Sequence, residues 1–415
     1  MTNIFKVKKI RQALLFTVLI MAVYAVGRHL LIPGISLLEG YTGNNSIALL
    51  SALTGGSFET FSLFSLGIGP SITASIIVQL LGMDVIPYIS NLKDEGTKGR
   101  KKLQKITQLL SVVLALLQSY SMIRLFDIQY NVLQDNSVSS YIYIMIIMTA
   151  GSMILYWLGN LVTEYGIGDG VSFIILLGIL VGMPTTLKNS YNALLSFTES
   201  SVTNYVLFAI YVVLLLAITF VVVYISTGIR KINITYGRKL ANGDKFTHLP
   251  VRVNSASVMP LIFANALITS PLIILSYFNQ SLYLTLSEKL STTEPLGLAI
   301  LVVLMLIMGI FYVLSSFDPE KISKNLAKNG GYIKGIRPDK ETVEYITKTI
   351  MNTSLVGIVG LLLLIAVPQI IGWIFKLPST ISFGGTSLVL IVSIVTSILE
   401  TFDANIKNTK YKEWF

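Results

Sequence analysis

One short segment of the chain, residues 166–169 (Gly-Ile-Gly-Asp), matches the G-x-G-D pattern of intramembrane aspartyl proteases. That chemistry needs a second carboxylate nearby, so that one acid and one base share a proton. Three further aspartates lie at the ends of apolar segments or beyond them: Asp127, Asp318 and Asp403. The alternative is that Asp169 accepts backbone N–H bonds at the start of a helix. The sequence favours this capping role over proteolysis.

Other reactive groups are scarce. The chain has no cysteine and only two histidines, His29 and His248, so thiolate chemistry and a multi-histidine metal site are excluded. It contains neither a G-x-S-x-G elbow nor a phosphate-binding P-loop. We therefore expect no enzymatic activity, no metal and no cofactor, and any energy from ATP must come from a partner.

The elements that would position these residues are membrane helices. Of 415 residues 53% are hydrophobic and only 13% are charged, against about a quarter charged in soluble domains. Because a bilayer-spanning helix needs roughly 20 apolar residues, the sequence predicts an all-α integral membrane protein with ten spans. The predicted spans are 13–32, 64–83, 106–126, 141–160, 168–183, 205–225, 256–277, 296–314, 353–375 and 380–399. The second contains Gly67, Gly69 and Pro70 and the fifth is short, so both are expected in the protein interior.

Charge predicts the orientation. Most of the 31 Lys and Arg residues fall at the two termini and in alternate loops, including 88–105, 226–252 and 317–351. Cytoplasmic loops carry the Lys and Arg excess in membrane proteins, so both termini are expected in the cytoplasm. The net charge of +10 is too small to predict a nucleic-acid partner.

Two halves of five spans each, residues 1–200 and 201–415, would enter the membrane in opposite directions and place a path between them. An inverted-repeat transporter of small molecules would also have this plan, but it needs an ionisable group at midplane. The spans carry almost no charge, and Gln79 and Asn265 are their notable polar residues. These two form hydrogen bonds between helices or mark a polar seam at a mobile helix contact.

Two loops are unusual. Residues 44–65 are too short and too polar to cross a membrane, so they either fold back into a protein-lined cavity or form an exposed interfacial helix. In the loop 317–351, Gly330, Gly331, Gly335 and Pro338 predict a hairpin-like fold with Arg337 at its tip, suited to docking a partner. The alternative is that this loop is a solvated topology signal.

Several segments resemble, in order along the chain, the SecY family of protein-conducting channels. They are FSLFSLGIGPSITASIIVQLL (61–81), TEYGIGDGVSFIILLGI (163–179), LPVRVNSASVMPLIFA (249–264), FDPEKISKNLAKNGGYIKGIRP (317–338) and FGGTSLVLIV (383–392). The resemblance implies a clam-shell of two five-helix halves around a pore. A lateral gate would lie between the second and third spans on one side and the seventh and eighth on the other, near Gln79 and Asn265.

The resemblance also assigns roles to residues. The segment 44–65 corresponds to the plug, with Leu53, Thr54, Gly55, Gly56 and Phe58. The aliphatic pore ring corresponds to Ile68, Ile72, Val171, Ile175, Ile262 and Leu390. Such a ring excludes water and ions by dewetting and yields around a moving chain.

Docking of a SecA-type ATPase motor is implied for five cations: Arg230, Lys231, Arg238, Lys239 and Arg337. Further implied partners are small SecE/SecG-like subunits, a signal sequence, the translocating polypeptide and anionic lipids. The implied location is a bacterial cytoplasmic membrane.

The chain departs from the family pattern at several positions. Asp169 replaces a usual Asn, Ser257 a usual Gly, and Gly69 and Ser71 a usual bulky pair, and the loop 226–252 is compact. With its abundance of Lys, Asn, Ser and Ile, the chain looks more like the accessory SecY of Gram-positive bacteria. That paralogue exports large serine-rich glycosylated surface proteins with an accessory SecA, and the housekeeping channel is the alternative.

Overall fold

The computed structural model describes residues 8–35, 61–82, 86–130, 133, 135, 137–166, 168–195, 201–236, 246–254, 258–374 and 384–412. The first half of this part contains helices α1 (Lys8–His29), α3 (Gly69–Leu81), α4 (Pro87–Asp94), α5 (Gly96–Tyr130), α6 (Val138–Tyr165) and α7 (Gly170–Leu195). The second half contains α8 (Ser201–Thr227), α9 (Met259–Phe278), α10 (Gln280–Lys289), α11 (Pro295–Ser316), α12 (Pro319–Lys328), α13 (Lys340–Ile374) and α15 (Gly384–Lys412). Three strands complete it: β1 (Ile229–Tyr236), β2 (Phe246–Arg252) and β3 (Gly331–Tyr332).

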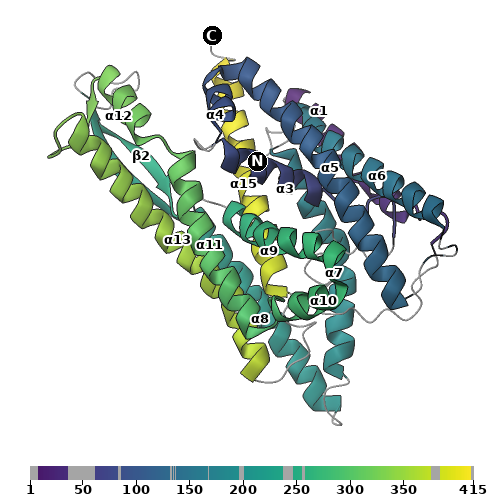
Figure 1. Ribbon diagram of the computed structural model, residues 1–415. Coiled ribbons are helices and arrows are strands. Elements are labelled where there is room, and N and C mark those ends of the chain that lie inside the picture. Colours follow the sequence, from purple (N-terminus) through teal and green to yellow (C-terminus); the bar gives the residue numbers. More distant parts are fainter. Residues whose placement is uncertain are drawn as a thin grey trace.

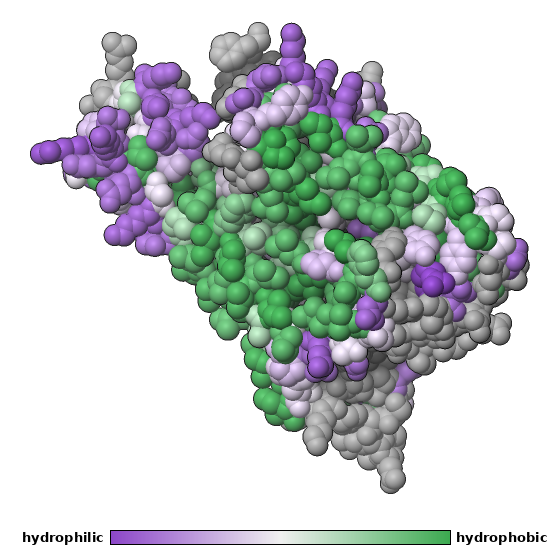
Figure 2. All heavy atoms as spheres, in the orientation of Figure 1, coloured by the Kyte–Doolittle hydropathy of each residue, from purple (hydrophilic) through white to green (hydrophobic). Residues whose placement is uncertain are grey.

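The helices match the spans expected from the sequence. Within the described residues, six helices are long and apolar enough to cross a membrane, namely α1, α5, α6, α8, α11 and α13. Four shorter apolar helices lie in α3, α7, α9 and α15. The outward face of α8 is apolar, with Phe220 73% exposed, and hydrophobic side chains cover the helical body in Figure 2. The all-α membrane fold is therefore confirmed.

The helices of the second and fifth predicted spans, α3 and α7, lie in the interior, as predicted, although α7 is longer than the run predicted for it. A tight turn precedes α3, with positive φ at Phe61 (44°) and Gly67 (59°), and Pro70 occupies the first turn of the helix. At the start of α7, a Cβ on Gly170 would lie 1.8 Å from the carbonyl oxygen of Gly159 on α6. Only glycine allows the two backbones to approach so closely.

Each half of the chain repeats one order of neighbours. In the first half α3 contacts α5, α5 contacts α6, α6 contacts α7, and α1 packs on α6. In the second half α9 contacts α11, α11 contacts α13, α13 contacts α15, and α8 packs on α13. The helix α8 also packs on α15, a contact that has no counterpart among the main contacts of α1. Between the halves, α9 touches α3 and α5, and α7 touches α8 and α15. Figure 1 shows the two groups side by side.

A three-stranded sheet stands beyond the helical body at one end, together with α12 (Figure 1). Its order is β2-β1-β3, and both pairings are antiparallel. The strand β3 comes from the loop 317–351, about which we predicted a hairpin-like fold. That prediction is wrong for the strand pairing, because residues 331–332 pair with β1 of the other loop and not within their own segment.

The sheet, α12 and the first turns of α13, here called the loop module, have their own core. It contains Ile232, Ile234, Val251, Leu326, Ile333, Ile346 and Ile350, and Val313 from the end of α11 packs into it. The module is fixed to the helical body at two places. The Arg252 guanidinium on β2 forms an ion pair with Glu400 on α15. On α13, Gly357 lies against the backbone after β2, where an added Cβ would be 2.2 Å from the carbonyl oxygen of Val253.

Candidate functional site

The Gly-Ile-Gly-Asp segment leads directly into α7. Asp169 Oδ2 accepts hydrogen bonds from the Ser172 backbone N–H at 3.0 Å and from the Ser172 hydroxyl at 2.6 Å. Gly168 turns the chain with a φ of 83°, and the N–H of Gly170 donates to the Thr163 hydroxyl at 2.9 Å. The prediction that Asp169 caps a helix is confirmed.

The six residues expected to form the pore ring all belong to one hydrophobic cluster. Ile68, Ile175, Ile262 and Leu390 are buried members of it, and Ile72 and Val171 pack against it. They come from the starts of four helices: α3, α7, α9 and α15. The same cluster also contains residues of α1, α6, α8, α11 and α13, so the six residues belong to the apolar core of the whole helical body.

Local structure explains where three of these helices begin. The carbonyl oxygen of Ile68 accepts the N–H groups of Ser71 and Ile72, both at 3.1 Å, so the helix begins at the ring. The Asp169 cap places Val171 in the first turn of α7, and Ile262 lies in the first turn of α9 behind Pro260. None of the six residues has an ionisable side chain, and an aliphatic lining of this kind would disfavour water and ions, so the ring stays a prediction.

The contact of α9 with α3 and α5 corresponds to the expected lateral gate. Asn265 on α9 is 5% exposed, and its Oδ1 has no hydrogen-bond partner in the described part of the chain. Gln79 on α3 is exposed, and its Nε2 lies 3.4 Å from Ser75 Oγ on the same helix. Neither of these two atoms forms a hydrogen bond between helices in the described part of the chain, and the role of both residues stays a prediction.

The expected plug residues Leu53, Thr54, Gly55, Gly56 and Phe58 lie outside the described residues. The segment that follows them runs antiparallel to the end of α1. There, Leu63 N–H donates to Leu30 O at 2.8 Å and Ile32 N–H to Phe61 O at 3.1 Å. The Phe61 ring meets Phe126 of α5 edge-on at 4.8 Å between centroids, which anchors this segment to the first half.

The expected docking cations that the structure describes are Arg230, Lys231 and Arg337, and they belong to the loop module and its connection to α13. Arg230 and Lys231 are exposed on β1, whereas Arg238 and Lys239 lie outside the described residues. Arg337 is exposed after a turn in which Gly335 has a φ of 86°.

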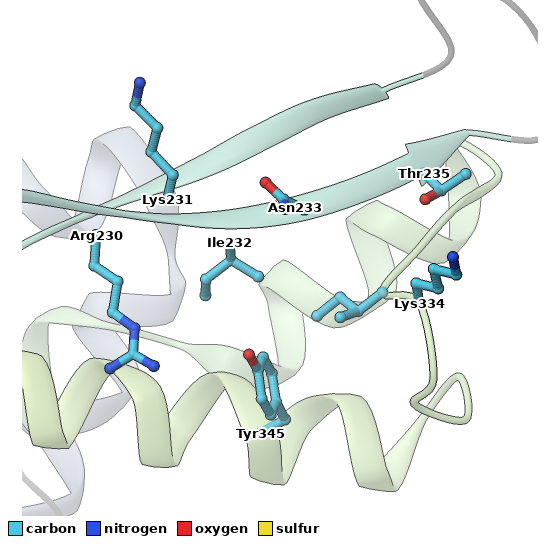
Figure 3. A pocket seen from close by; sticks show the side chains of 8 residues that line it. Arg230, Lys231, Ile232, Asn233, Thr235, Lys334 and Tyr345 are labelled. Atoms are coloured by element: carbon cyan, nitrogen blue, oxygen red, sulfur yellow. The ribbon is translucent and has the colours of Figure 1, made fainter.

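The backbone of Arg337 is held on both sides. Its N–H donates to Glu341 Oε2 at 3.2 Å, and its carbonyl oxygen accepts the Thr342 hydroxyl at 2.8 Å. A cavity of about 500 Å³ opens between β1, the residues after β3 and α13 (Figure 3).

Sequence reasoning missed the strands that join the two loops. The signal was the alternation of Ile232, Ile234 and Tyr236 with polar residues, which is typical of a half-buried strand. The two inner isoleucines are buried in the module core, and Tyr236 packs against it. In the part of the chain that is described, no group of three or more His, Asp and Glu residues could hold a metal.

Comparisons with known proteins agree with this arrangement. The SecY family model matches residues 62–399. The protein translocase subunit SecY of Staphylococcus carnosus is 33% identical over 419 residues, covering 99% of this chain and 97% of that protein. SecY of Bacillus subtilis is 33% identical over 421 residues, covering 99% and 98%.

Solved structures show the same fold. A structure described as a protein conducting channel has a TM-score of 0.68 at 19% identity, covering 95% of this chain and 92% of that one. A second, of a SecY protein whose plug domain stabilises the closed channel, has a TM-score of 0.64 at 20% identity and the same coverage. With a family match over most of its length and relatives above 30% identity over nearly all of it, the chain belongs to the SecY family of protein translocase channel subunits.

Proposed function

We propose that this chain forms the pore through which a Sec-type translocase moves unfolded polypeptides across a bacterial cytoplasmic membrane. The observation that carries the proposal is the single cluster that contains Ile68, Ile72, Val171, Ile175, Ile262 and Leu390. Flexible aliphatic side chains from four helix starts seal a closed channel and separate without breaking polar bonds. A translocating chain would then form no specific polar bonds with the pore and would meet only flexible apolar side chains.

The experiment uses the absence of native cysteines. A single cysteine at Ile72 or Leu390 is expected to cross-link to a secretory chain stalled during export, because these side chains would line its path. Phe220→Cys on the exposed face of α8 is the matched control and should give no adduct. Adducts at Phe220 together with none at Ile72 and Leu390 would contradict the pore.

The two halves, residues 1–200 and 201–415, are proposed to be related by inversion and to open like a clam-shell. The repeated order of neighbours supports this: α1, α3, α5, α6 and α7 correspond in sequence order to α8, α9, α11, α13 and α15. An odd number of spans per half reverses the second half in the membrane. Both termini and the loop module are then cytoplasmic, and the plug segment 44–65 is on the outer side. The lateral gate would lie between α3 and α5 on one side and α9 and α11 on the other.

The loop module is proposed to dock a SecA-type ATPase through Arg230, Lys231, Arg238, Lys239 and Arg337. Support comes from the exposure of the described members and from the fixed backbone of Arg337. Arg337→Glu is expected to reduce ATP-driven export while membrane insertion of the chain is unchanged. Small SecE/SecG-like subunits, signal sequences and anionic lipids are the remaining proposed partners.

Within this function, we propose the accessory role, in which an accessory SecA drives export of serine-rich glycosylated surface proteins. Asp169, Ser257, Gly69 and Ser71 support it as departures from the family pattern. The housekeeping role is the second candidate, favoured by near-complete coverage of the Bacillus subtilis protein.

A strain lacking this chain separates the two roles. Selective loss of a serine-rich glycoprotein from the surface supports the accessory role. Equal loss of ordinary secreted proteins supports the housekeeping role.

A further inference from the structure

The cavity of the loop module lies along one edge of β1. Its lining comprises Arg230, Lys231, Ile232, Asn233, Thr235, Ile333, Lys334 and Tyr345. Figure 3 shows Arg230 and Ile232 directed from β1 toward α13, Lys231 and Asn233 on the opposite face, and the Tyr345 hydroxyl directed from α13 toward the sheet. The cavity is therefore bounded by a strand on one side and a helix on the other.

The register of β1 and β2 determines which backbone groups face this cavity. Residues 228 and 253 are opposite one another, and Val253 N–H donates to Gly228 O at 2.9 Å, so they form a hydrogen-bonded pair. Since such pairs alternate with pairs that are not bonded to each other, the N–H and C=O groups of Lys231 and Asn233 point away from β2. Pro250 opposite Lys231 agrees, because proline has no N–H to give to the β1–β2 ladder.

The third strand covers only a small part of that edge. Thr235 pairs with Tyr332 and Tyr236 with Gly331, and the pairing stops there. Gly335, with its φ of 86°, then turns the chain away. The backbone groups of Lys231 and Asn233 are left without a strand partner among the described residues. From Ile229, where β1 begins, to Asn233 this open edge is about 13 Å long at about 3.3 Å per residue.

The opposite edge of the sheet is protected. The outward groups of β2 belong to Phe246, His248, Pro250 and Arg252, and Pro250 removes one N–H donor from that row. Proline on an edge strand is a common device against pairing with further strands. The edge of β1 has no proline, so the two edges of one sheet differ in their capacity to accept another strand.

Charge indicates what the open edge would accept. The lining carries three cations, Arg230, Lys231 and Lys334, and no acid. Unpaired backbone donors and acceptors recognise an extended peptide, and the cations select acidic side chains on it. We propose that the open edge of β1 binds an extended acidic peptide segment of a cytoplasmic partner protein as an added strand.

The added strand fits both faces of β1. Its side chains would alternate between the side of Arg230, Ile232 and Tyr345 and the side of Lys231 and Asn233. The inference rests on the proposed docking role of the module, because both use Arg230 and Lys231. It adds how the partner would be held there.

The test measures binding of a fluorescein-labelled pentapeptide of alternating glutamate and valine to the full chain in nanodiscs. Asn233→Pro removes one N–H from the open edge and no charge, and should weaken binding at least about tenfold. The matched control is His248→Pro, which removes the N–H of the directly opposite residue from the other edge of the same sheet. It should change the affinity less than about twofold. A twofold change corresponds to about 0.4 kcal/mol of binding free energy, at about 1.4 kcal/mol per tenfold.

A second measurement needs no variant. Two N-methylated peptides are compared with the unmodified probe. One carries the methyl groups on the odd-numbered amides and the other on the even-numbered amides. Because only one of these sets faces β1 in an added strand, one peptide should bind at least about tenfold more weakly. Equal binding by both peptides, or equal losses for Asn233→Pro and His248→Pro, would overturn the added strand. Displacement of the probe by inorganic phosphate, with no effect of methylation, would identify simple anion binding instead. Neither result depends on export, so the pore proposal is tested separately.

Discussion

The helical body and the loop module both pack aliphatic side chains, yet they differ in what surrounds them. The body has a large cluster enclosed by apolar helix faces, whereas the module has a small core of isoleucine, leucine and valine beneath exposed cations. In the described residues every ion pair lies in the module, at its anchor or in the loop around α4: Glu95 with Lys102, Arg252 with Glu400, Asp318 with Lys321, and Glu320 with Lys324.

The difference shows that water around the module and lipid around the helical body favour different kinds of packing. Water drives the module core together because burial removes apolar surface from water. Lipid supplies no such force between helices, so close backbone packing must hold the body together. Gly151 illustrates it, since an added Cβ would lie 1.8 Å from the carbonyl oxygen of Leu63. Hence the body depends on glycines and the module on buried isoleucines.

The largest effect is expected where the two regions join. Gly357→Leu places a side chain against the backbone oxygen of Val253 and should cost at least about 3 kcal/mol of unfolding free energy. The melting temperature of the purified chain in detergent, followed by size-exclusion chromatography, measures the loss. The matched control is Gly360→Ala on the same helix, whose Cβ meets only the movable end of Ile225 at 2.8 Å. Equal losses of unfolding free energy for the two variants would contradict the close contact between Gly357 and Val253.

A cavity in the body should affect both stability and sealing. Leu390→Ala removes a side chain that is 3% exposed and is expected to cost about 2 to 3 kcal/mol. Because Leu390 is also a proposed ring residue, ions should leak through the closed channel in proteoliposomes. Phe220→Ala on the lipid-facing side of α8 is the control and should leave the vesicles tight. Tight vesicles with Leu390→Ala would remove this residue from the seal.

A cavity of similar size in the module should leave the seal intact. Ile346 on α13 is fully buried in the module core, and Ile346→Ala is expected to cost about 2 kcal/mol. Limited proteolysis of the loops should accelerate and ATP-driven export should fall, while ion leakage stays at the wild-type level. Leakage equal to that of Leu390→Ala would show that the two regions are not separate.

The ion pair between β2 and α15 should contribute less to the unfolding free energy than the packing contacts above. The Arg252 and Glu400 side chains are 51% and 28% exposed, so their ion pair is screened and worth less than about 1 kcal/mol. A double-mutant cycle with Arg252→Ala and Glu400→Gln at low and high salt measures the coupling. A coupling energy well above that value, unaffected by salt, would indicate that the module is held to the body mainly by charge.

The smallest effect is expected at Asp169. Asn caps helices about as well as Asp, so Asp169→Asn should change the unfolding free energy by no more than about 0.5 kcal/mol. Export should continue at the wild-type rate, since the carboxylate has only a capping role. A large loss of export with unchanged stability would reopen a chemical role for this residue.

Local sequence signals predicted much of the helical body. The apolar runs identified the spans, and the glycines and proline of 64–83 identified an interior helix. The position of Asp169 at the start of the fifth apolar run was sufficient to identify a cap. Such features depend on neighbours a few positions apart, so the sequence displays them directly. The prediction of a hairpin around Gly335 was wrong in its strand pairing, because residues 331–332 pair with β1, which belongs to the other loop.

By itself, the sequence determined that this protein is a bundle of membrane helices with few ionisable groups inside, since hydropathy and charge act on each segment separately. Tertiary structure alone decided that four helix starts meet in one aliphatic cluster and that β3 joins β1 across about a hundred residues. It also decided that one edge of the sheet is open while the other is protected by Pro250. These features depend on register and packing between distant segments, which hydropathy along the chain does not encode.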